Sequence, residues 1–481
     1  EGTERRFVSA CSDSGRVSET NESAGEACGR CGRAGFRAVS TRAITELLET
    51  KFIKRDNPVV FHPHTPNDGR MTDAFLPFDE LLETVEQRRF DRPPAVVANA
   101  HVTGLGVARA LAAHDVPVIA LDRSGDGVAP RSDAVTLAGE VTYPLDDSDG
   151  FREDVERLAD ALDHEPVAFG CMDEWALAFA EEEPAGVRLP FADYEIIDGV
   201  LDKYALYERA ERLGVPYPET HFLDETAPAD AADALSFPFV VKPARKREFE
   251  EAVGTNVLEV ADEAEFMDIV ELAAEEGMRI MAQEKVTKAA GEDHSFASYV
   301  RPDDGDTLGV VGNARVRYPT GYGTSCVVDR VDEPVIEERA TTMLEDADYY
   351  GISESEFVYD TDREEYVLLD INTRPWKWIG MPVAAGANLP MAAYADAVGT
   401  ETVHIGPLDT RWVYLADYLR LNFEDPSFDD VLAPSEWETL LSGEFRSGQG
   451  LTTGVYLPSD PGPAYALLET EFAEREYYCA C

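Results

Sequence analysis

Residues 365–378 read EYVLLDINTRPWKW, an apolar run that ends in polar and aromatic residues. The run predicts a strand over residues 365–372. Because side chains alternate along a strand, Asp370 and Asn372 face the same side. The preceding strand pattern, SEFVYD, adds Glu356. Mg²⁺ binds oxygen ligands, carboxylates above all, so these three residues predict a magnesium site, with Arg374 directly after it.

Two lysines upstream lie at the ends of predicted elements. DKYALYERAERLGVP, residues 202–216, has the pattern of a helix that is capped by Asp202 and opened by Lys203. PFVVKPA, residues 238–244, is an apolar strand that reaches Lys242 near its end. Lysines in such positions can offset the charge of phosphate groups during their transfer.

Two further strand patterns carry candidate groups. RIMAQEKV, residues 279–286, ends in residues whose main chain could meet a nucleotide base. TLGVVGNARVRYP, residues 307–319, carries Arg315 and Arg317, which alternate with apolar residues and should share one face that lines a cleft. Arginine suits a bidentate contact with a carboxylate or phosphate. The whole set therefore supplies lysines for phosphates, a strand edge for a base and oxygen ligands for Mg²⁺.

This ordered set resembles the ATP-grasp superfamily, and within it the carboxylate–amine ligase-like proteins. The resemblance runs from about residue 93 to about residue 399. It is densest in DKYALYERAERLGVPYPET (202–220), NARVRYPTGYGT (313–324) and LLDINTRPWKWIGMPVAAGANLP (368–390). It implies ATP and Mg²⁺ as cofactors, with Mn²⁺ as an alternative metal.

The resemblance also implies a role for each candidate residue. The two lysines would contact phosphates, the main chain at the strand end would meet the adenine edge, and one of two adjacent acids would hold the ribose. The residues implied to bind ATP are Lys203, Lys242, Glu284, Lys285, Val286, Glu292 and Asp293. The residues implied to bind the metal are Glu356, Asp370 and Asn372, and those implied to act in catalysis are Arg315, Arg317 and Arg374.

The implied reaction moves the γ-phosphate of ATP to a small carboxylate, and an amine then attacks the acyl phosphate, giving ADP and phosphate. Two other functions of such a site stay open. One is an ATP-dependent carboxylation with bicarbonate, and the other is a regulator that binds ATP without catalysis. Trp376 and Trp378 would line the substrate pocket or form a core pair.

Two features depart from the family pattern. Asp370 stands where a glutamate is usual, and its side chain is one methylene shorter. The lid after Lys242 has few glycines and instead carries a basic cluster, Arg245, Lys246 and Arg247.

The predicted fold class is α/β and α+β: a Rossmann-like pre-ATP-grasp domain followed by an ATP-grasp fold of two α+β subdomains. The Rossmann-like part is expected from a strand, turn, helix and strand order in AVVANAHVTGLGVARALAAHDVPVIALDR. The predicted boundaries are a leader at 1–70, a lead-in helix with the Rossmann-like domain at 71–190, the ATP-grasp domain at 191–399 with a lid at about 217–286, and a C-terminal extension at 400–481.

A weaker nucleotide motif lies in the Rossmann-like part. Gly104-Leu-Gly106 follows a strand, and Asp122 ends the next strand, as in dinucleotide-binding folds. Arg109 stands where the third glycine is expected and would keep the helix away from the strand. We therefore expect a structural turn at Gly104, and an NAD-dependent oxidoreductase is the less favoured alternative.

The chain of 481 residues has a formal net charge of −52, with 94 acidic and 42 basic residues. Such a charge argues against nucleic acid and against anionic membrane surfaces as partners. Lysine is scarce relative to arginine, and the composition resembles that of proteins that work in molar salt, where self-repulsion is screened. No apolar run is long enough for a membrane span, so the cytoplasm is the expected location, and a homodimer is left open.

The leader differs from the rest of the chain. Residues 1–70 hold 10 acidic and 11 basic residues, whereas residues 71–481 hold 84 and 31. The first methionine is Met71. We expect the leader to be mostly disordered, with translation starting at Met71, and the lone Cys28-Gly-Arg-Cys31 pair in it to be two reduced thiols rather than a zinc site.

Overall fold

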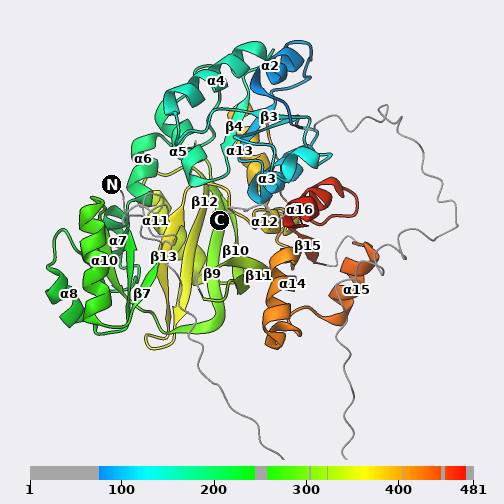
Figure 1. Ribbon diagram of the computed structural model, residues 1–481. Helices are drawn as coiled ribbons and strands as arrows, with labels where there is room; N and C mark the ends of the chain where they lie inside the picture. Colours follow the sequence, from blue (N-terminus) through cyan, green and yellow to red (C-terminus); the bar gives the residue numbers. More distant parts are fainter. Residues whose placement is uncertain are drawn as a thin grey trace, which may run out of the picture. The chain divides into compact units, whose positions relative to one another are not determined.

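The computed structural model describes residues 75–243, 257–302, 305–321, 323–402, 404, 406–445 and 450–472, all of which belong to one compact unit (Figure 1). The leader, the cysteine pair in it and the basic cluster of the lid lie outside the described residues. The expectations for these segments therefore stay predictions.

The first part of the chain forms a parallel sheet of four short apolar strands, as expected for strands that are covered on both faces. The strand order is β3-β2-β1-β4, so the chain builds outward from β1 on one side and then returns to its other side. Ligands of open parallel sheets bind at such a reversal, outside the carboxyl ends of the strands. The elements are α2 (Phe78–Glu86), β1 (Ala95–Ala98), α3 (Val102–Ala112), β2 (Val118–Asp122), β3 (Leu137–Glu140), α4 (Ser148–Ala161), β4 (Val167–Gly170) and α5 (Asp173–Glu182).

A small antiparallel sheet of order β5-β8-β6-β7 follows, and its residues fall within the predicted lid. Its own core forms around Phe239 and Phe266, whose rings meet edge to face at 4.9 Å. The elements of this stretch are α6 (Tyr194–Leu201), α7 (Lys203–Leu213), β5 (Thr220–Phe222), α8 (Pro228–Leu235), β6 (Phe239–Pro243), β7 (Leu258–Val260), α10 (Glu263–Glu275) and β8 (Ile280–Glu284).

A seven-stranded sheet of order β13-β12-β9-β10-β11-β14-β15 forms the largest layer (Figure 1). Its last two strands come from the predicted C-terminal extension, and β14 pairs with β11 while β15 pairs with β14. The strands are β9 (Lys288–Val300), β10 (Thr307–Tyr318), β11 (Thr324–Val331), β12 (Gly351–Asp360), β13 (Glu365–Asn372), β14 (Arg411–Val413) and β15 (Leu451–Thr453). The helices are α11 (Pro334–Asp346), α12 (Gly380–Ala384), α13 (Leu389–Val398), α14 (Leu415–Glu424), α15 (Pro434–Ser442) and α16 (Gly462–Phe472).

The predicted turn at Gly104 is wrong, because α3 begins at Val102 and both glycines lie in its first turns. The glycines are needed for close packing rather than for a bend. A Cβ on Gly104 would lie 2.1 Å from the carbonyl oxygen of Asn99, and a Cβ on Gly106 would lie 2.6 Å from Cγ2 of Ile379. The second contact brings the first domain directly against the loop that follows β13.

A second local difference concerns β11, which was not predicted. The sequence TSCVVDRV changes from apolar to charged residues halfway, so it shows neither regular alternation nor a long apolar run. Pairing with β10 on one side and β14 on the other makes it a strand.

A buried ion pair fixes the C-terminal segment to the first domain. The Arg109 guanidinium on α3 donates to Asp460 at 2.9 Å and to the carbonyl groups of Gly454 and Val455. Asp460 also accepts from Ser132 at 2.6 Å and from the N–H of Asp133 at 3.0 Å. The arginine that was expected to disturb a helix–strand contact therefore points away from the sheet and holds residues 454–460.

Arg109→Met is expected to lower the free energy of unfolding by about 3 kcal/mol, because it leaves the Asp460 carboxylate buried without its cation. Urea unfolding in molar KCl, followed by circular dichroism, measures the change. Arg131→Gln is the matched control, since Arg131 pairs with Glu469 on the surface, and an exposed pair contributes about 1 kcal/mol or less. If both variants lose the same free energy of unfolding, the Arg109–Asp460 pair stabilises the protein no more than an exposed pair does.

Candidate active site

A cavity of about 370 Å³ lies where the three sheets meet. The first domain contributes Thr103 from the start of α3 and residues 172–174 at the start of α5, so this wall stands at the β1/β4 reversal. The small sheet contributes residues of β6 and of the end of β8. The large sheet contributes residues of β9 to β13 and the loop after β13. Segments from the whole predicted set of motifs thus converge on one cavity.

The two predicted phosphate lysines both line this cavity. Lys203 is the first residue of α7, directly after Asp202, whose side chain caps the helix through the N–H of Ala205. Its side chain is buried and its ammonium contacts the Asp370 carboxylate. Lys242 lies on β6, and its Nζ atom donates to Gln283 Oε1 at 2.7 Å. Both ammonium groups are therefore held at the wall of the cavity, one from helix α7 and the other from β6.

Gln283 is a further residue that lines the cavity, and the sequence indicated no role for it. It is 1% exposed, and its amide nitrogen donates to the Tyr207 hydroxyl at 3.0 Å and to Thr220 Oγ1 at 2.8 Å. Burial raises the pKa of Tyr207 to about 12, so this hydroxyl stays protonated and donates to the Leu369 carbonyl at 2.9 Å. The network fixes the amide oxygen that orients Lys242. A lone glutamine in a strand carries no sequence signal for such a role.

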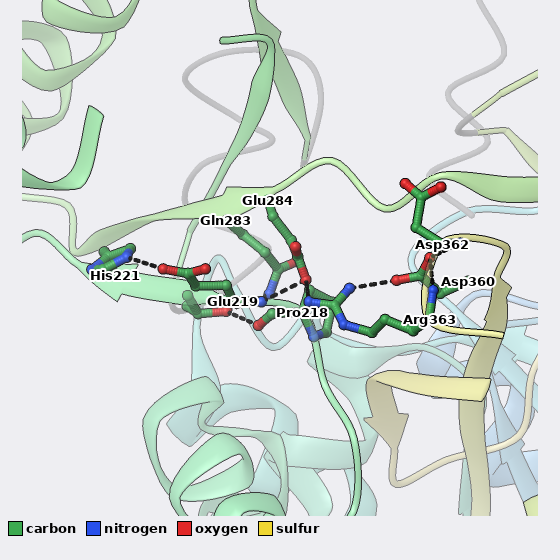
Figure 2. Close-up of polar contacts among 9 residues, drawn as sticks. Pro218, Glu219, His221, Gln283, Glu284, Asp360, Asp362 and Arg363 are labelled. Carbon is green, nitrogen blue, oxygen red and sulfur yellow. Dashed lines mark hydrogen bonds and ion pairs between the residues drawn. The ribbon is translucent and has the colours of Figure 1, made fainter. Parts of the chain in front are cut away.

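The end of β8 forms the expected strand edge. Glu284, Lys285 and Val286 all line the cavity. Figure 2 shows the Glu284 side chain turned toward the Glu219 main chain and Arg363; the N–H of Glu219 donates to it at 2.8 Å. The N–H of Glu284 donates to the Glu219 carbonyl, so its carbonyl and the N–H of Val286 are the main-chain candidates for a base.

Of the two adjacent acids predicted for the ribose, the structure brings only Asp293 to the cavity. Asp293 is buried and accepts from Lys288 Nζ at 2.9 Å. Glu292 points to the other face of β9, where its carboxylate lies 3.6 Å from His294 Nε2. Strand alternation separates the two neighbours, so the choice follows from the register of β9.

The predicted metal ligands lie side by side on β12 and β13. Glu356 is the cross-strand partner of Asp370, and Glu354 is the partner of Asn372. The Asn372 amide nitrogen donates to Glu356 Oε1 at 2.9 Å and to Glu354 Oε2 at 3.2 Å. Glu354 is an additional residue that a pattern could have found, since it lies two positions before Glu356 on the same strand face.

This donor set fits Mg²⁺. Three carboxylates and one amide oxygen are hard ligands, and Mg²⁺ in nucleotide sites usually takes one or two carboxylates together with substrate phosphates. Within the described ranges, no group of three or more His, Cys, Asp or Glu side chains is placed so that it could hold a metal ion, so the amide oxygen and substrate phosphates would have to complete the site. Lys203 neutralises Asp370 in the protein as it stands.

The two strand arginines do not share a face. Arg317 lines the cavity, whereas Arg315 is exposed and lies outside it. The pairing of β10 with β11 is irregular between Ala314 and Arg317, and such a bulge breaks the alternation on which the expectation rested. Arg317 faces Asp293 and Glu356, each at 3.7 Å. Its Nε atom is buried and has no hydrogen-bond partner, which leaves a donor for a ligand oxygen.

Arg374 joins the first domain to the large sheet. It makes a bidentate contact with Asp173 at the start of α5, with distances of 2.5 and 3.1 Å, and it lines the cavity. Burial opposes its charge, but Asp173 and the nearby Glu354 outweigh burial, so the pKa of Arg374 lies above its usual value. The guanidinium therefore stays charged at any pH at which the protein folds.

The weaker motif of the first domain has no open site. Asp122 is buried and accepts from the N–H groups of Ala100 at 2.7 Å and Arg123 at 2.8 Å. Burial raises the pKa of this carboxyl group. Asp122 thus ties the end of β2 to the loop after β1, which argues against a role in holding the ribose of NAD.

The chain has the ATP-grasp fold of the solved structures that it resembles, and the predicted mixed α/β class is confirmed. The detail predicted for the N-terminal domain stays a prediction. No family model matches the chain. Among solved structures, N5-carboxyaminoimidazole synthetase from Staphylococcus aureus has a TM-score of 0.52 with 14% identity, over 71% of this chain and 87% of that one. Pyruvate carboxylase from Rhizobium etli has a TM-score of 0.51 with 16% identity, over 64% of this chain and 29% of that one.

One curated protein is similar in sequence, the D-aspartate ligase of Enterococcus faecium. The identity is 24% over 222 residues, which are 44% of this chain and 52% of that protein. The chain thus spans about half the length of the curated relative it matches. No helix in the described part of the chain is long and apolar enough to cross a membrane.

Proposed function

We propose that the protein is an ATP-dependent ligase that joins a carboxylate to an amine through an acyl phosphate, releasing ADP and phosphate. The observation that carries this proposal is the cavity itself. It gathers two phosphate-type lysines, a strand edge suited to a base, an acidic corner suited to Mg²⁺ and two arginines. The name of the similar curated protein, a D-aspartate ligase, supports the same class of reaction.

Lys203 and Lys242 hold the ATP phosphates in this proposal, and the main chain at Glu284 and Val286 meets the adenine. A structural neighbour, the Staphylococcus aureus synthetase, has been solved with ADP. Asp293 would accept from a ribose hydroxyl. Lys242 and the end of β8 belong to the small sheet and Asp293 to the large sheet, so the nucleotide would bridge the two sheets.

Glu356, Asp370 and Asn372 hold Mg²⁺, or Mn²⁺, with Glu354 beside them. The metal supplies positive charge that offsets the charge on the transferred phosphoryl group. ATP and Mg²⁺ would also take over the Asp370–Lys203 contact, which frees the ammonium for a phosphate. Arg317, whose Nε atom lacks a hydrogen-bond partner, is the group best placed to bind the oxygen on which negative charge develops.

The proposal is tested by measuring ADP release in molar KCl with a panel of amino acids and small acids as carboxylate and amine, with aspartate among them. ADP is expected only when ATP, Mg²⁺, a carboxylate and an amine are all present, and the product mass should equal the sum of the two substrates less water. ADP release with bicarbonate as the acid would point to a carboxylase. ATP binding without ADP release for every pair would point to a regulator.

Three properties stay predictions beside this one. We infer from the acidic composition that the enzyme needs molar salt, and full thermal stability without KCl would contradict this. The cytoplasmic location and a homodimer also stay predictions.

A further inference from the structure

Lysine has an unusual distribution in this chain. The sequence contains only eight lysines against 34 arginines. Five of the eight belong to the described residues, and all five line the one cavity: Lys203, Lys242, Lys285, Lys288 and Lys377. Elsewhere in the described ranges every strong cation is an arginine. An ammonium is a compact point charge, whereas a guanidinium is a planar fork, so the two cations are not interchangeable in such a cavity.

Lys377 is a lysine of this group to which the proposed ATP site gives no role. It lies between Trp376 and Trp378 in the loop after β13, and its side chain is 9% exposed. Its ammonium donates to Asp417 on α14 at 2.6 Å and to Thr324 at 2.9 Å, and it lies 4.1 Å from the ring centre of Tyr414. An ammonium has three N–H donors, and these two hydrogen bonds use two of them.

A second donor lies beside it. Trp376 is 3% exposed and lines the cavity, and its indole Nε1 atom is buried without a hydrogen-bond partner. A buried donor that no protein group satisfies costs free energy unless a ligand or water accepts from it. The two neighbouring residues thus add one charged and one neutral donor to the lining of the cavity, and a carboxylate oxygen can accept from either kind of donor.

The partner of Lys377 lies on a different strand from the acidic corner. Glu356 lies on β12, whereas Thr324, which holds Lys377, lies on β11, three places along the sheet. Adjacent strands are about 4.8 Å apart, so the backbones of these two strands are on the order of 14 Å apart across the sheet. Lys377 is thus held from a strand that carries none of the predicted metal ligands.

We propose that Lys377, with Trp376, binds a second, non-reacting carboxylate of a substrate, so that the substrate pair includes an amino acid or a dicarboxylic acid. The inference rests on the proposed ligase function. Asp417 sets the position of the ammonium, and α14, which belongs to the predicted C-terminal extension, thereby becomes part of the substrate site. Lys377 acts on binding and takes no part in phosphoryl transfer.

Lys377 could instead serve only to tether α14 to the sheet. A matched pair of variants separates the two roles. Lys377→Gln/Asp417→Asn removes both charges together, so that no unpaired charge is left buried. Tyr318→Phe is the control. It removes another contact of α14, the 2.8 Å hydrogen bond from the Tyr318 hydroxyl to Glu424, and leaves the charges of the cavity intact.

The assay uses the substrate pair that the screen for ADP release identifies. The double variant is expected to raise the KM of the carboxylate-bearing substrate about tenfold or more, as for loss of uniform binding. Both kcat and the KM for ATP should stay within about threefold of the wild-type values. Tyr318→Phe should leave all three constants near the wild-type values. A fall in kcat at unchanged KM would overturn the proposal, as would an equal rise of KM in Tyr318→Phe.

A labelling experiment gives an answer that does not depend on turnover. Lysines of the wild-type protein are methylated reductively, and each is quantified by mass spectrometry with aspartate, succinate or the uncharged succinamide present. Aspartate or succinate should slow the modification of Lys377, and succinamide should not. Equal labelling under all conditions would overturn the assignment. Protection of Lys203 and Lys242 by MgADP reports separately on the nucleotide site, so failure of the proposed function is recognised independently.

Discussion

Replacing Lys242 with alanine is expected to abolish ADP formation and to leave the fold intact. The ammonium is half-buried at the wall of the cavity, where it donates to Gln283. Loss of a preorganised charge at the site of phosphoryl transfer costs about 3–4 kcal/mol of transition-state stabilisation, a fall of roughly 10²–10³ in kcat/KM. A coupled ADP assay measures it.

The control for Lys242→Ala comes from the same small sheet. Arg279 lies at the start of β8, and its contact with Asp224 joins two side chains that are 53% and 42% exposed. Arg279→Gln should therefore keep both the melting temperature and kcat/KM near the wild-type values. Lys242→Arg is a stricter variant, since a planar fork cannot replace a point charge on the same network. Full activity of Lys242→Ala would refute the nucleotide assignment.

Arg374→Met is expected to have the largest effect on stability. The change leaves the Asp173 carboxylate without its buried bidentate partner, and breaking such a pair costs about 3–5 kcal/mol of the free energy of unfolding. Activity should disappear as well, because the arginine lines the cavity and fixes the first domain against the large sheet. Urea unfolding in molar KCl and the ADP assay measure the two effects.

A double variant separates the two contributions of Arg374. Arg374→Met/Asp173→Leu removes both charges, and replacement of a buried ion pair by apolar residues often restores stability. The double variant should regain at least about half of the free energy of unfolding that Arg374→Met loses, because no buried charge is left unpaired. ADP formation should stay absent. Recovery of activity in the double variant would mean that Arg374 only holds the domains together.

The predictable part of the site is the part that depends on short-range periodicity. The strand at residues 365–372 was predicted with its observed bounds, and with it the shared face of Asp370 and Asn372. The caps of α7 followed from Asp202 and Gly214 in the same way. In each case the local pattern and the tertiary environment demand the same structure.

The missed features depend on pairing between distant segments. The bulge on β10 that separates Arg315 from Arg317 arises from its register with β11, which no local pattern encodes. Gln283 matters because Tyr207 and Thr220 meet it across elements. The turn at Gly104 was predicted from glycine content. The structure instead requires glycine at 104 because Asn99 lies close to it, and at 106 because Ile379 does.

The pairing of β14 with β11 also has a consequence for the nascent chain. Until residues 411–413 have left the ribosome, β11 has no neighbour on its outer side, and it presents unpaired N–H and C=O groups. The same interval leaves Lys377 without Asp417. The growing polypeptide therefore carries an open, aggregation-prone edge from the synthesis of β11 until that of β14.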